Sequence, residues 1–492
     1  MPLANRARMR IVRDLDVLGL RRRREGRDAD AQLAEMLAWQ RERVDPKDRA
    51  ESALPADEAL AWHGVLVAEA YGPSHVPALL RAIEELGWDQ PRDLTTNSSL
   101  PDWILGTRGQ TVGGGFWPLN LTRERQSTLD THVLRAQLPR GVAFARGMFL
   151  TPTPALTVLV LFFAFEDEPA SRVEGVLRER TLSEGRRVDD GWVIDSVPNV
   201  KLDRVAHVRS QLRGLGGNFL SEYLPGAFAT DLDAEQPACE VLTTKRWDPL
   251  DPDSGRDEER SARSYLWAVG LERPLRGWTA SEFDGWRLEL PDTWTRSPAM
   301  VLCAKTEHVT GAASGADPGS PTEQVSSLLF HRTEGVVALW ACEELLRGYS
   351  ALLGLARDEV RHDARGVRAG LKRLRDVRRR LLGDAADART LAEELAHAAG
   401  DGSTRPWRLD LDFKPLRADH WPQGRLQELV LNEIGRRADV VAAVERRVRA
   451  DLALDSEVVG ATANLQAQRW VWALTALLGA VTIALAAYQI WG

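Results

Sequence analysis

Residues Val471–Ile490 have the sequence VWALTALLGAVTIALAAYQI, twenty consecutive positions without a charge. A helix of this length rises about 30 Å at about 1.5 Å per residue, which matches the hydrocarbon core of a bilayer. Aromatic rings prefer the two membrane interfaces, and four stand near the two ends of this helix: Trp470, Trp472, Tyr488 and Trp491. The sequence therefore predicts one transmembrane helix at residues 470–491.

Basic residues before this helix predict its orientation. Arg469 is the last charged residue, and Arg446, Arg447 and Arg449 lie a few turns earlier. Because basic residues stay on the cytoplasmic side, we expect a single-pass inner-membrane protein with its N-terminal bulk in the cytoplasm and its C-terminus outside. The N-terminal region has no apolar run of signal-peptide length, which argues against export of the large domain.

The composition of the whole chain is that of a soluble protein. Over 492 residues, 27% are charged, the mean hydropathy is -0.29 and the formal net charge is -7, which excludes a polytopic membrane bundle and a mostly disordered chain. The negative charge argues against nucleic acid as a partner. Only six of the 64 basic residues are Lys, an Arg excess typical of bacteria with GC-rich genomes. Cys239, Cys303 and Cys342 form no CxxC pair, so we expect reduced core residues rather than disulfides or a zinc site.

Residues 1–50 form a basic leader, in which nine Arg face three acidic residues over the first 27 positions. Such a block is typical of an arm that binds a membrane surface or nucleic acid, or of a solvated leader with a helix at 31–43. We favour the solvated leader.

Residues 51–333 alternate short apolar runs with amphipathic helices, which predicts a mixed α/β domain of the α+β fold class. An acidic, proline-interrupted segment suggests a division into two lobes near 240–262, with the later strands completing or accompanying the first sheet. We expect strands at 64–70, 142–150, 154–165, 263–271, 286–290, 300–307 and 325–331, and helices at 76–87, 169–180 and 205–223.

Beyond residue 333 the pattern is helical. Residues 334–423 form a helical segment with helices at 335–382 and 390–399, and residues 424–469 form a stalk helix that continues into the transmembrane helix. Apolar positions recur along the stalk at spacings of three, four and seven, the pattern of a coiled coil that needs partner helices. These positions are Val430, Ile434, Val441, Val444, Val448, Leu452 and Val459.

The sequence ATANLQAQRWVWALTALLGAVTIALAAY at 461–488, together with the order of α/β domain, long helices and stalk, resembles the CorA-type magnesium transporters. In that family the stalk helices of five subunits line a pore, so the resemblance implies a stalked, oligomeric membrane protein. The family's Gly-Met-Asn filter and second membrane helix are missing, because Tyr488 is followed by Gln489, Ile490, Trp491 and Gly492.

Polar and small residues form one stripe on the transmembrane helix. Gln468, Thr475, Thr482 and Gln489 share one heptad phase, with Gly479 beside them. Polar groups in lipid gain by facing sister helices or a wet lumen, which indicates a homo-oligomeric bundle or a narrow pore. Equally, each Thr hydroxyl can bond to a carbonyl of its own helix, with Gln489 at the interface. The sequence leaves both interpretations open.

A basic ridge precedes the stalk at steps of three and four residues. It could meet the phosphates of lipid or nucleic acid. We favour a solvated flank whose charges pair with acids of neighbouring helices, such as Glu428, Glu433, Asp439 and Glu445. The ridge consists of Arg357, Arg361, Arg365, Arg368, Lys372, Arg375 and Arg379.

The sequence offers little that is typical of an enzyme. Two Glu-x-x-His pairs, Glu359 with His362 and Glu394 with His397, have the spacing of di-iron ligands, but the further inward Glu residues of such sites are not evident. The glycines at 113–115 lack the context of a phosphate loop and indicate a flexible turn. We therefore predict no catalytic, cofactor or metal residues, although a site assembled from distant residues leaves no motif.

Three functions follow from these patterns, in order of preference. The first is a bacterial membrane protein whose cytosolic α/β domain reports through a helical stalk to an oligomeric membrane bundle, as a channel-like or membrane-perturbing effector. The second is a tail-anchored scaffold whose membrane helix only localises an interaction domain. The third is an enzyme held at the membrane. The expected partners are the lipid bilayer, other copies of the chain and an unidentified protein.

Overall fold

A computed structural model describes most of the chain. The described residues are 26–90, 98–110, 113–123, 133–188, 191–251, 264–271, 277–291, 299–312, 320–329, 332–361, 367–383, 385–400, 412–416 and 424–491.

Ten strands of the described chain form one sheet in the order β12-β9-β10-β11-β8-β1-β5-β4-β2-β3. Neighbouring strands are mostly antiparallel, but β11 runs parallel to β8, and β3 runs parallel to β2. The strands are β1 (Leu60–Tyr71), β2 (Gly115–Thr122), β3 (Val133–Arg135), β4 (Val142–Thr153), β5 (Leu156–Phe165), β8 (Ala238–Thr244), β9 (Trp278–Ala280), β10 (Trp286–Glu289), β11 (Met300–Lys305) and β12 (Phe413–Pro415). This confirms the prediction of a mixed α/β chain.

Strand β5 shows why helices cover both faces of the sheet. All ten of its residues, LTVLVLFFAF, are buried, and alternate side chains of a strand point to opposite faces. Val158 and Val160 belong to one apolar core, and Leu159 and Leu161 belong to another. A strand without a polar face is stable only between two layers of helices.

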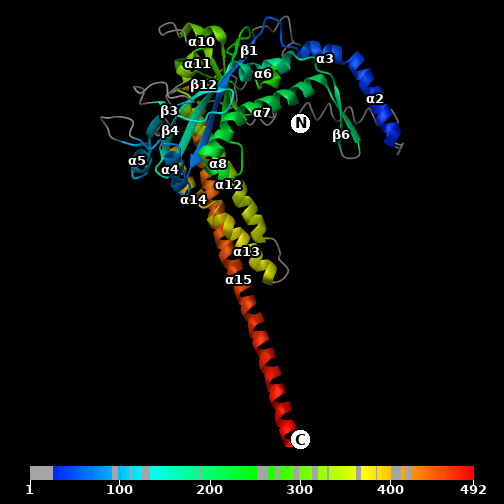
Figure 1. The fold of residues 1–492 in the computed structure, drawn as a ribbon, viewed down its shortest axis with the longest axis vertical. Helices are drawn as coiled ribbons and strands as arrows, with labels where there is room; N and C mark the ends of the chain where they lie inside the picture. Colours follow the sequence, from blue (N-terminus) through cyan, green and yellow to red (C-terminus); the bar gives the residue numbers. More distant parts are fainter. Residues whose placement is uncertain are drawn as a thin grey trace.

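Helices cover both faces of the sheet (Figure 1). One face is covered by α4 (Val76–Glu85), α5 (Leu100–Arg108), α6 (Asp167–Arg178), α7 (Val197–Tyr223) and α9 (Ser264–Ala268). The other face is covered by α8 (Ala227–Thr230), α10 (Thr306–Ala312), α11 (Pro321–Leu329) and α12 (Glu334–Arg361). Helices α13 (Val367–Leu382), α14 (Ala388–Gly400) and α15 (Leu426–Trp491) extend this second layer.

An arm projects from one side of the sheet. It contains α2 (Gly26–Arg43), α3 (Asp45–Ser52) and a separate hairpin of β6 (Glu184–Val188) with β7 (Gly191–Asp195). In Figure 1 the hairpin and α2 lie together beyond the end of α7. The carboxylate of Asp45 accepts hydrogen bonds from the backbone N–H and the hydroxyl of Ser183, which ties the leader helices to the residue directly before the hairpin.

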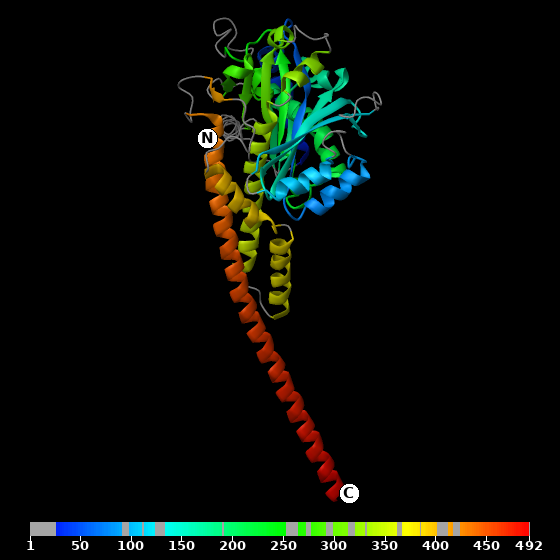
Figure 2. The same cartoon turned by 90° about the vertical axis from the view of Figure 1, so that its left-hand side faces the viewer.

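Helix α15 has two different halves. Its first half packs on α12 and α14, where Ile434, Val441 and Val448 are fully buried. An ion pair of 2.7 Å joins Arg437 to Glu343 of α12, and Arg373 of α13 pairs with Asp455. Beyond that point α15 extends past all the other elements drawn (Figure 2). The apolar positions before Asp455 therefore find their partners within the same chain, which corrects the expectation that all of them await a partner helix.

Two predicted strands are wrong. The segment expected as a strand at 263–271 contains helix α9, and the segment expected at 325–331 lies in α11 as far as Leu329. Short apolar runs fit either structure, and in each case the run packs as one face of a helix. The helix predicted at 335–382 is divided into α12 and α13.

Strand β8 falls in the middle of the sheet, although the sequence suggested a boundary between lobes near 240–262. It pairs with β1 on one side and with β11 on the other, so the strands before and after it form one continuous sheet. The later strands thus complete the first sheet. The carboxylate of Glu240 in β8 is buried, and it accepts hydrogen bonds from Arg209 and Arg213 of α7, each at 2.7 Å.

Candidate functional site

A polar junction joins the sheet to the helices that hold α15. Strand β1 ends at Tyr71, and the following turn brings Ser74 and His75 against Asp387, the residue that precedes α14. The backbone N–H and the hydroxyl of Ser74 both donate to Oδ2 of Asp387, at 2.9 and 2.6 Å. A Cβ at Gly72 would lie 2.3 Å from the same oxygen, so only glycine leaves room for this carboxylate.

His75 lies between two carboxylates. Its Nε2 is 3.1 Å from Oδ1 of Asp231, which follows α8, and its Nδ1 is 3.6 Å from Oδ2 of Asp387. Burial alone would lower the pKa of His75, but the hydrogen bonds and charges of Asp231 and Asp387 outweigh burial and raise the pKa to about 9. His75 is therefore a buried cation at neutral pH, and Ser74 and His75 in turn lower the pKa of Asp387 despite its burial.

Four further hydrogen bonds extend the junction to α12 and to the turn between β4 and β5. The hydroxyl of Tyr349, in the middle of α12, donates to Oδ2 of Asp231 at 3.1 Å. Glu394 of α14 accepts a hydrogen bond from the N–H of Ala155 at 2.7 Å. Arg108 donates to the carbonyls of Tyr71 and Ala155 at 2.6 and 2.9 Å. Helices α12 and α14 are thus both fixed to one end of the sheet.

A second buried carboxylate lies close to this junction. Burial raises the pKa of Glu69 to about 7, although the N–H groups of Ala70 and Phe228 and the amide of Gln236 donate to it. Because Phe228 belongs to α8 and Asp231 follows α8, this short helix is held at its start by Glu69 and at its end by His75. Both holding groups are titratable.

The junction does not have the donor set of a metal centre. Among the described residues, no three His, Cys, Asp or Glu side chains gather as metal ligands. Glu394 is engaged by Ala155, and His397 is exposed. Glu359 pairs with Arg380, and His362 lies outside the described residues. The hydrogen bonds of the junction thus join separate elements of the fold.

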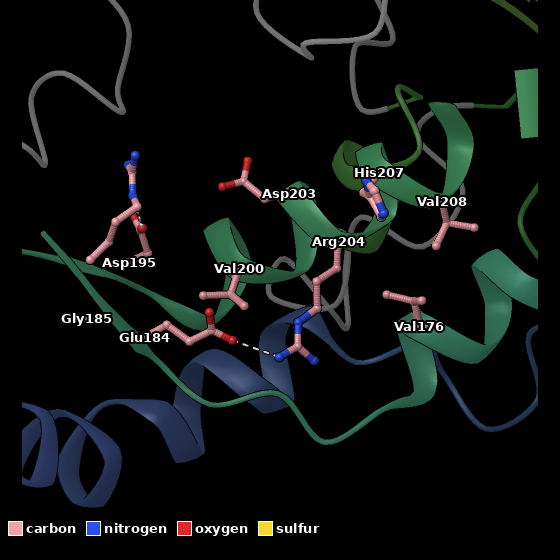
Figure 3. Close-up of a pocket in the computed structure, with 10 residues that line it drawn as sticks. Val176, Glu184, Gly185, Asp195, Val200, Asp203, Arg204, His207 and Val208 are labelled. Carbon is pink, nitrogen blue, oxygen red and sulfur yellow. Dashed lines mark hydrogen bonds and ion pairs between the residues drawn. The ribbon is translucent and has the colours of Figure 1, made fainter. Parts of the chain in front are cut away.

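A surface pocket of about 560 Å³ lies between the β6–β7 hairpin and helices α6 and α7 (Figure 3). Four of its charged groups form two ion pairs: Arg204 pairs with Glu184 at 2.7 Å and Arg186 pairs with Asp195 at 3.3 Å. His207 projects from α7 and contacts Gln211 at 2.9 Å, one turn along the same helix. Ion pairs of this exposed kind are typical of a solvated surface.

The buried cysteines carry no chemistry at this site. Cys239, Cys303 and Cys342 are free and buried in three separate elements, as expected from the sequence. Burial raises the pKa of each thiol well above its usual range, which keeps the thiols protonated and unreactive.

The second candidate site is the C-terminal half of α15. In the described chain, α15 is the one helix long and apolar enough to cross a membrane by length and composition, and its apolar window is not buried by other elements. Gln468, Arg469, Trp470, Trp472 and Gly479 are exposed on it. Tyr488, Gln489 and Trp491 belong to the same helix, but their side chains lie outside the described set.

The two threonines of the predicted stripe bond within their own helix. The hydroxyl of Thr475 donates to the carbonyl of Val471, and that of Thr482 donates to the carbonyl of Leu478, each at 2.8 Å. For the two threonines, these are the bonds that the second of the two interpretations expects. The hydroxyl groups therefore need no sister helix to satisfy them.

The ridge residues whose side chains the structure describes do not pair with the acids proposed for them. Glu433 pairs with Arg436 and Arg437, and Glu445 pairs with Arg449, all within α15. Of the ridge, Lys372, Arg375 and Arg379 are exposed on α13, and Arg357 pairs with Asp358. Arg361 and Arg368 lie in helices without a described side chain, and Arg365 lies outside the described residues.

Sequence reasoning missed the junction completely. Its members stand at 74, 75, 231, 349 and 387, and no spacing in the sequence connects them. The only local signal is that two polar residues, Ser74 and His75, directly follow a buried strand.

Comparison with known proteins adds no relative to this picture. No protein-family model, no curated protein and no solved structure matches the chain.

Proposed function

We propose that this chain is a non-enzymatic, single-pass protein of a bacterial inner membrane, in which a cytosolic α/β domain acts through a helical stalk on a membrane bundle of several copies. The state of the α/β domain is passed to the bundle, which acts as a channel-like or membrane-perturbing effector. In this proposal the bulk of the chain lies in the cytoplasm, and residues 470–491 cross the bilayer.

One observation carries the proposal: α15 runs as a single helix from its contacts with α12 and α14 to its apolar end. The junction around His75 and Asp387 supports it, because it fixes those two helices to the end of β1. A rearrangement of that end of the sheet would therefore move α15. The CorA-like order of domain, stalk and membrane helix agrees with this proposal but does not extend it to magnesium.

The alternative is a tail-anchored scaffold, in which the membrane helix only localises the α/β domain near its partners. The hydroxyl bonds of Thr475 and Thr482 favour this alternative, because they remove one reason for the membrane helices to associate. The two functions differ in whether the membrane becomes permeable.

Two experiments separate these proposals. First, the full chain and a chain ending at Arg469 are expressed, and membranes are washed with alkaline carbonate; we expect only the full chain to stay in the pellet. Release of the full chain would contradict membrane anchoring. Second, the full chain is reconstituted into dye-loaded liposomes. Dye or ion leakage supports the effector, whereas stable, impermeable liposomes that retain the protein support the scaffold.

A further inference from the structure

The part of α15 between the folded body and the membrane span carries an exposed apolar seam. Leu454, Val458 and Leu465 are 63%, 62% and 60% exposed, and Ala461 lies exposed between them. Their spacing is four, three and four residues, so they occupy successive a and d positions of a heptad repeat. Unlike the residues of the span, they lie in the part of α15 that we place in water.

This seam faces away from the chain's own helices. On a straight helix with about 100° per residue, its centre lies about 160° around the axis from the face that packs on α12 and α14. That packed face consists of Leu431, Ile434, Ala438, Val441, Glu445 and Val448. Leu454, at the start of the seam, stays 63% exposed although the adjacent Asp455 pairs with Arg373 of α13. A partner can therefore reach the seam without displacing any described element.

The same heptad phase continues into the membrane span. From Leu465 the steps of three and four lead to Gln468, Trp472, Thr475, Gly479 and Thr482. A partner that covers the whole line must have a helix with both a water-exposed part and a membrane-spanning part. A second copy of this chain has both, and the membrane holds its helix parallel and at the same height.

The charge of the segment also fits a second copy. Asp455 and Glu457 lie between the first two seam residues, but residues 458–468, VVGATANLQAQ, carry no charge, so over that stretch copies can approach without repulsion between like charges. Around a symmetry axis each residue meets its own equivalent, and a neutral seam is the simplest surface that tolerates this. The absence of charge on the seam and its position on the side of α15 away from the folded body are two independent observations, and both favour a second copy as the partner.

We propose that copies of this chain associate with one another through a parallel coiled coil along Leu454, Val458, Ala461, Leu465 and Gln468, just outside the membrane. This inference rests on the proposed function, because the membrane span sets the parallel arrangement. It places the association in the aqueous segment, where burying Leu and Val is favourable, rather than in the threonines of the span, whose hydroxyls are already bonded.

Cysteine crosslinking in native membranes tests the seam directly. The native thiols at Cys239, Cys303 and Cys342 are buried, so they give little background. We compare Ala461→Cys and Gln468→Cys on the seam with Gly460→Cys and Ala467→Cys, which are exposed on another side of α15. We expect about fivefold or more disulfide-linked dimer at the seam positions, because equivalent d positions lie within disulfide reach.

A charged pair tests the driving force. Val458→Glu with Leu465→Glu should abolish the crosslink at Ala461→Cys, whereas Gly460→Glu with Ala467→Glu, with the same spacing and charge, should leave it unchanged. Equal crosslinking on and off the seam, or a crosslink to a different protein, would overturn the proposal. All samples are first washed with alkaline carbonate. Loss from the membrane refutes anchoring, and retention without the seam-specific pattern refutes only the pairing.

Discussion

The hydroxyl of Ser74 donates to the carboxylate of Asp387 at 2.6 Å, although 313 positions separate the two residues in the chain. One end of the sheet is thereby fixed to the start of α14, and α14 packs on α15. This short contact connects the α/β domain to α15, the helix whose apolar end is long enough to cross a membrane.

Asp387→Asn should weaken this junction. An amide cannot hold the charge of His75 or accept as strongly from Ser74, so we expect a loss of about 2–4 kcal/mol in the free energy of unfolding. Urea denaturation of the full chain in detergent, followed by Trp fluorescence, measures the loss. Glu393→Gln is the control, because Glu393 makes an exposed ion pair with Arg389 on α14, and its removal should cost less than about 1 kcal/mol. Equal losses in the two variants would argue against a special role for the junction.

Loss of the positive charge on His75 should make the chain less stable at alkaline pH. Its pKa is raised from 6.5 to about 9 in the folded chain, so its contribution is fully present below about pH 6.5 and is lost as the pH rises through about 9. The contribution has an upper value of about 3 kcal/mol. The difference in unfolding free energy between the wild-type chain and His75→Gln should therefore shrink between pH 6.5 and 9.5. His207→Gln, on the exposed side of α7, serves as the comparison, and a similar pH trend there would remove the support for His75.

Ile434→Ala should loosen the attachment of α15. The side chain of Ile434 is fully buried where α15 packs on the neighbouring helices. Truncating it should therefore lower the free energy of unfolding by about 2–5 kcal/mol and expose α15 to proteases. Val440→Ala removes methyl groups from an exposed position on the same helix and should cost well under 1 kcal/mol. Limited proteolysis and urea denaturation distinguish the two, and an unchanged cleavage pattern for Ile434→Ala would contradict the assigned packing.

Thr475→Val with Thr482→Val should leave membrane retention and crosslinking at Ala461→Cys unchanged. Both hydroxyls bond to carbonyls of their own helix, so replacing them removes no contact with another chain. A clear drop in the crosslinked fraction would show instead that the threonines act between helices, as the polar bundle requires.

Structural features that arise from residues adjacent in the sequence could be predicted from the sequence alone. The unbroken apolar run of β5 predicts a strand buried on both faces, and the uncharged end of α15 predicts a helix able to cross a membrane. Strand β8 was missed because Glu240 interrupts its apolar pattern. That carboxylate is tolerated only because Arg209 and Arg213 reach it from α7, which no local pattern reveals.

The packing of α15 illustrates a second limit. Its heptad spacing correctly indicates that partner helices are needed, but spacing alone does not say whether those helices belong to the same chain. Val441 and Val448 are covered by the same chain, whereas Val458 and Leu465 are exposed. What separates the two cases is where α12, α13 and α14 lie along α15, which only the folded structure shows.

The continuity of α15 also limits the kind of motion it can pass on. Arg469 and Trp470 favour the membrane interface, so pushing the helix along its axis would carry them into hydrocarbon or pull apolar residues into water. Turning the helix about its axis moves no residue to a different depth. Because hydrogen bonds along an unbroken helix keep its residues in a fixed angular relation, we expect α15 to transmit torque much better than thrust.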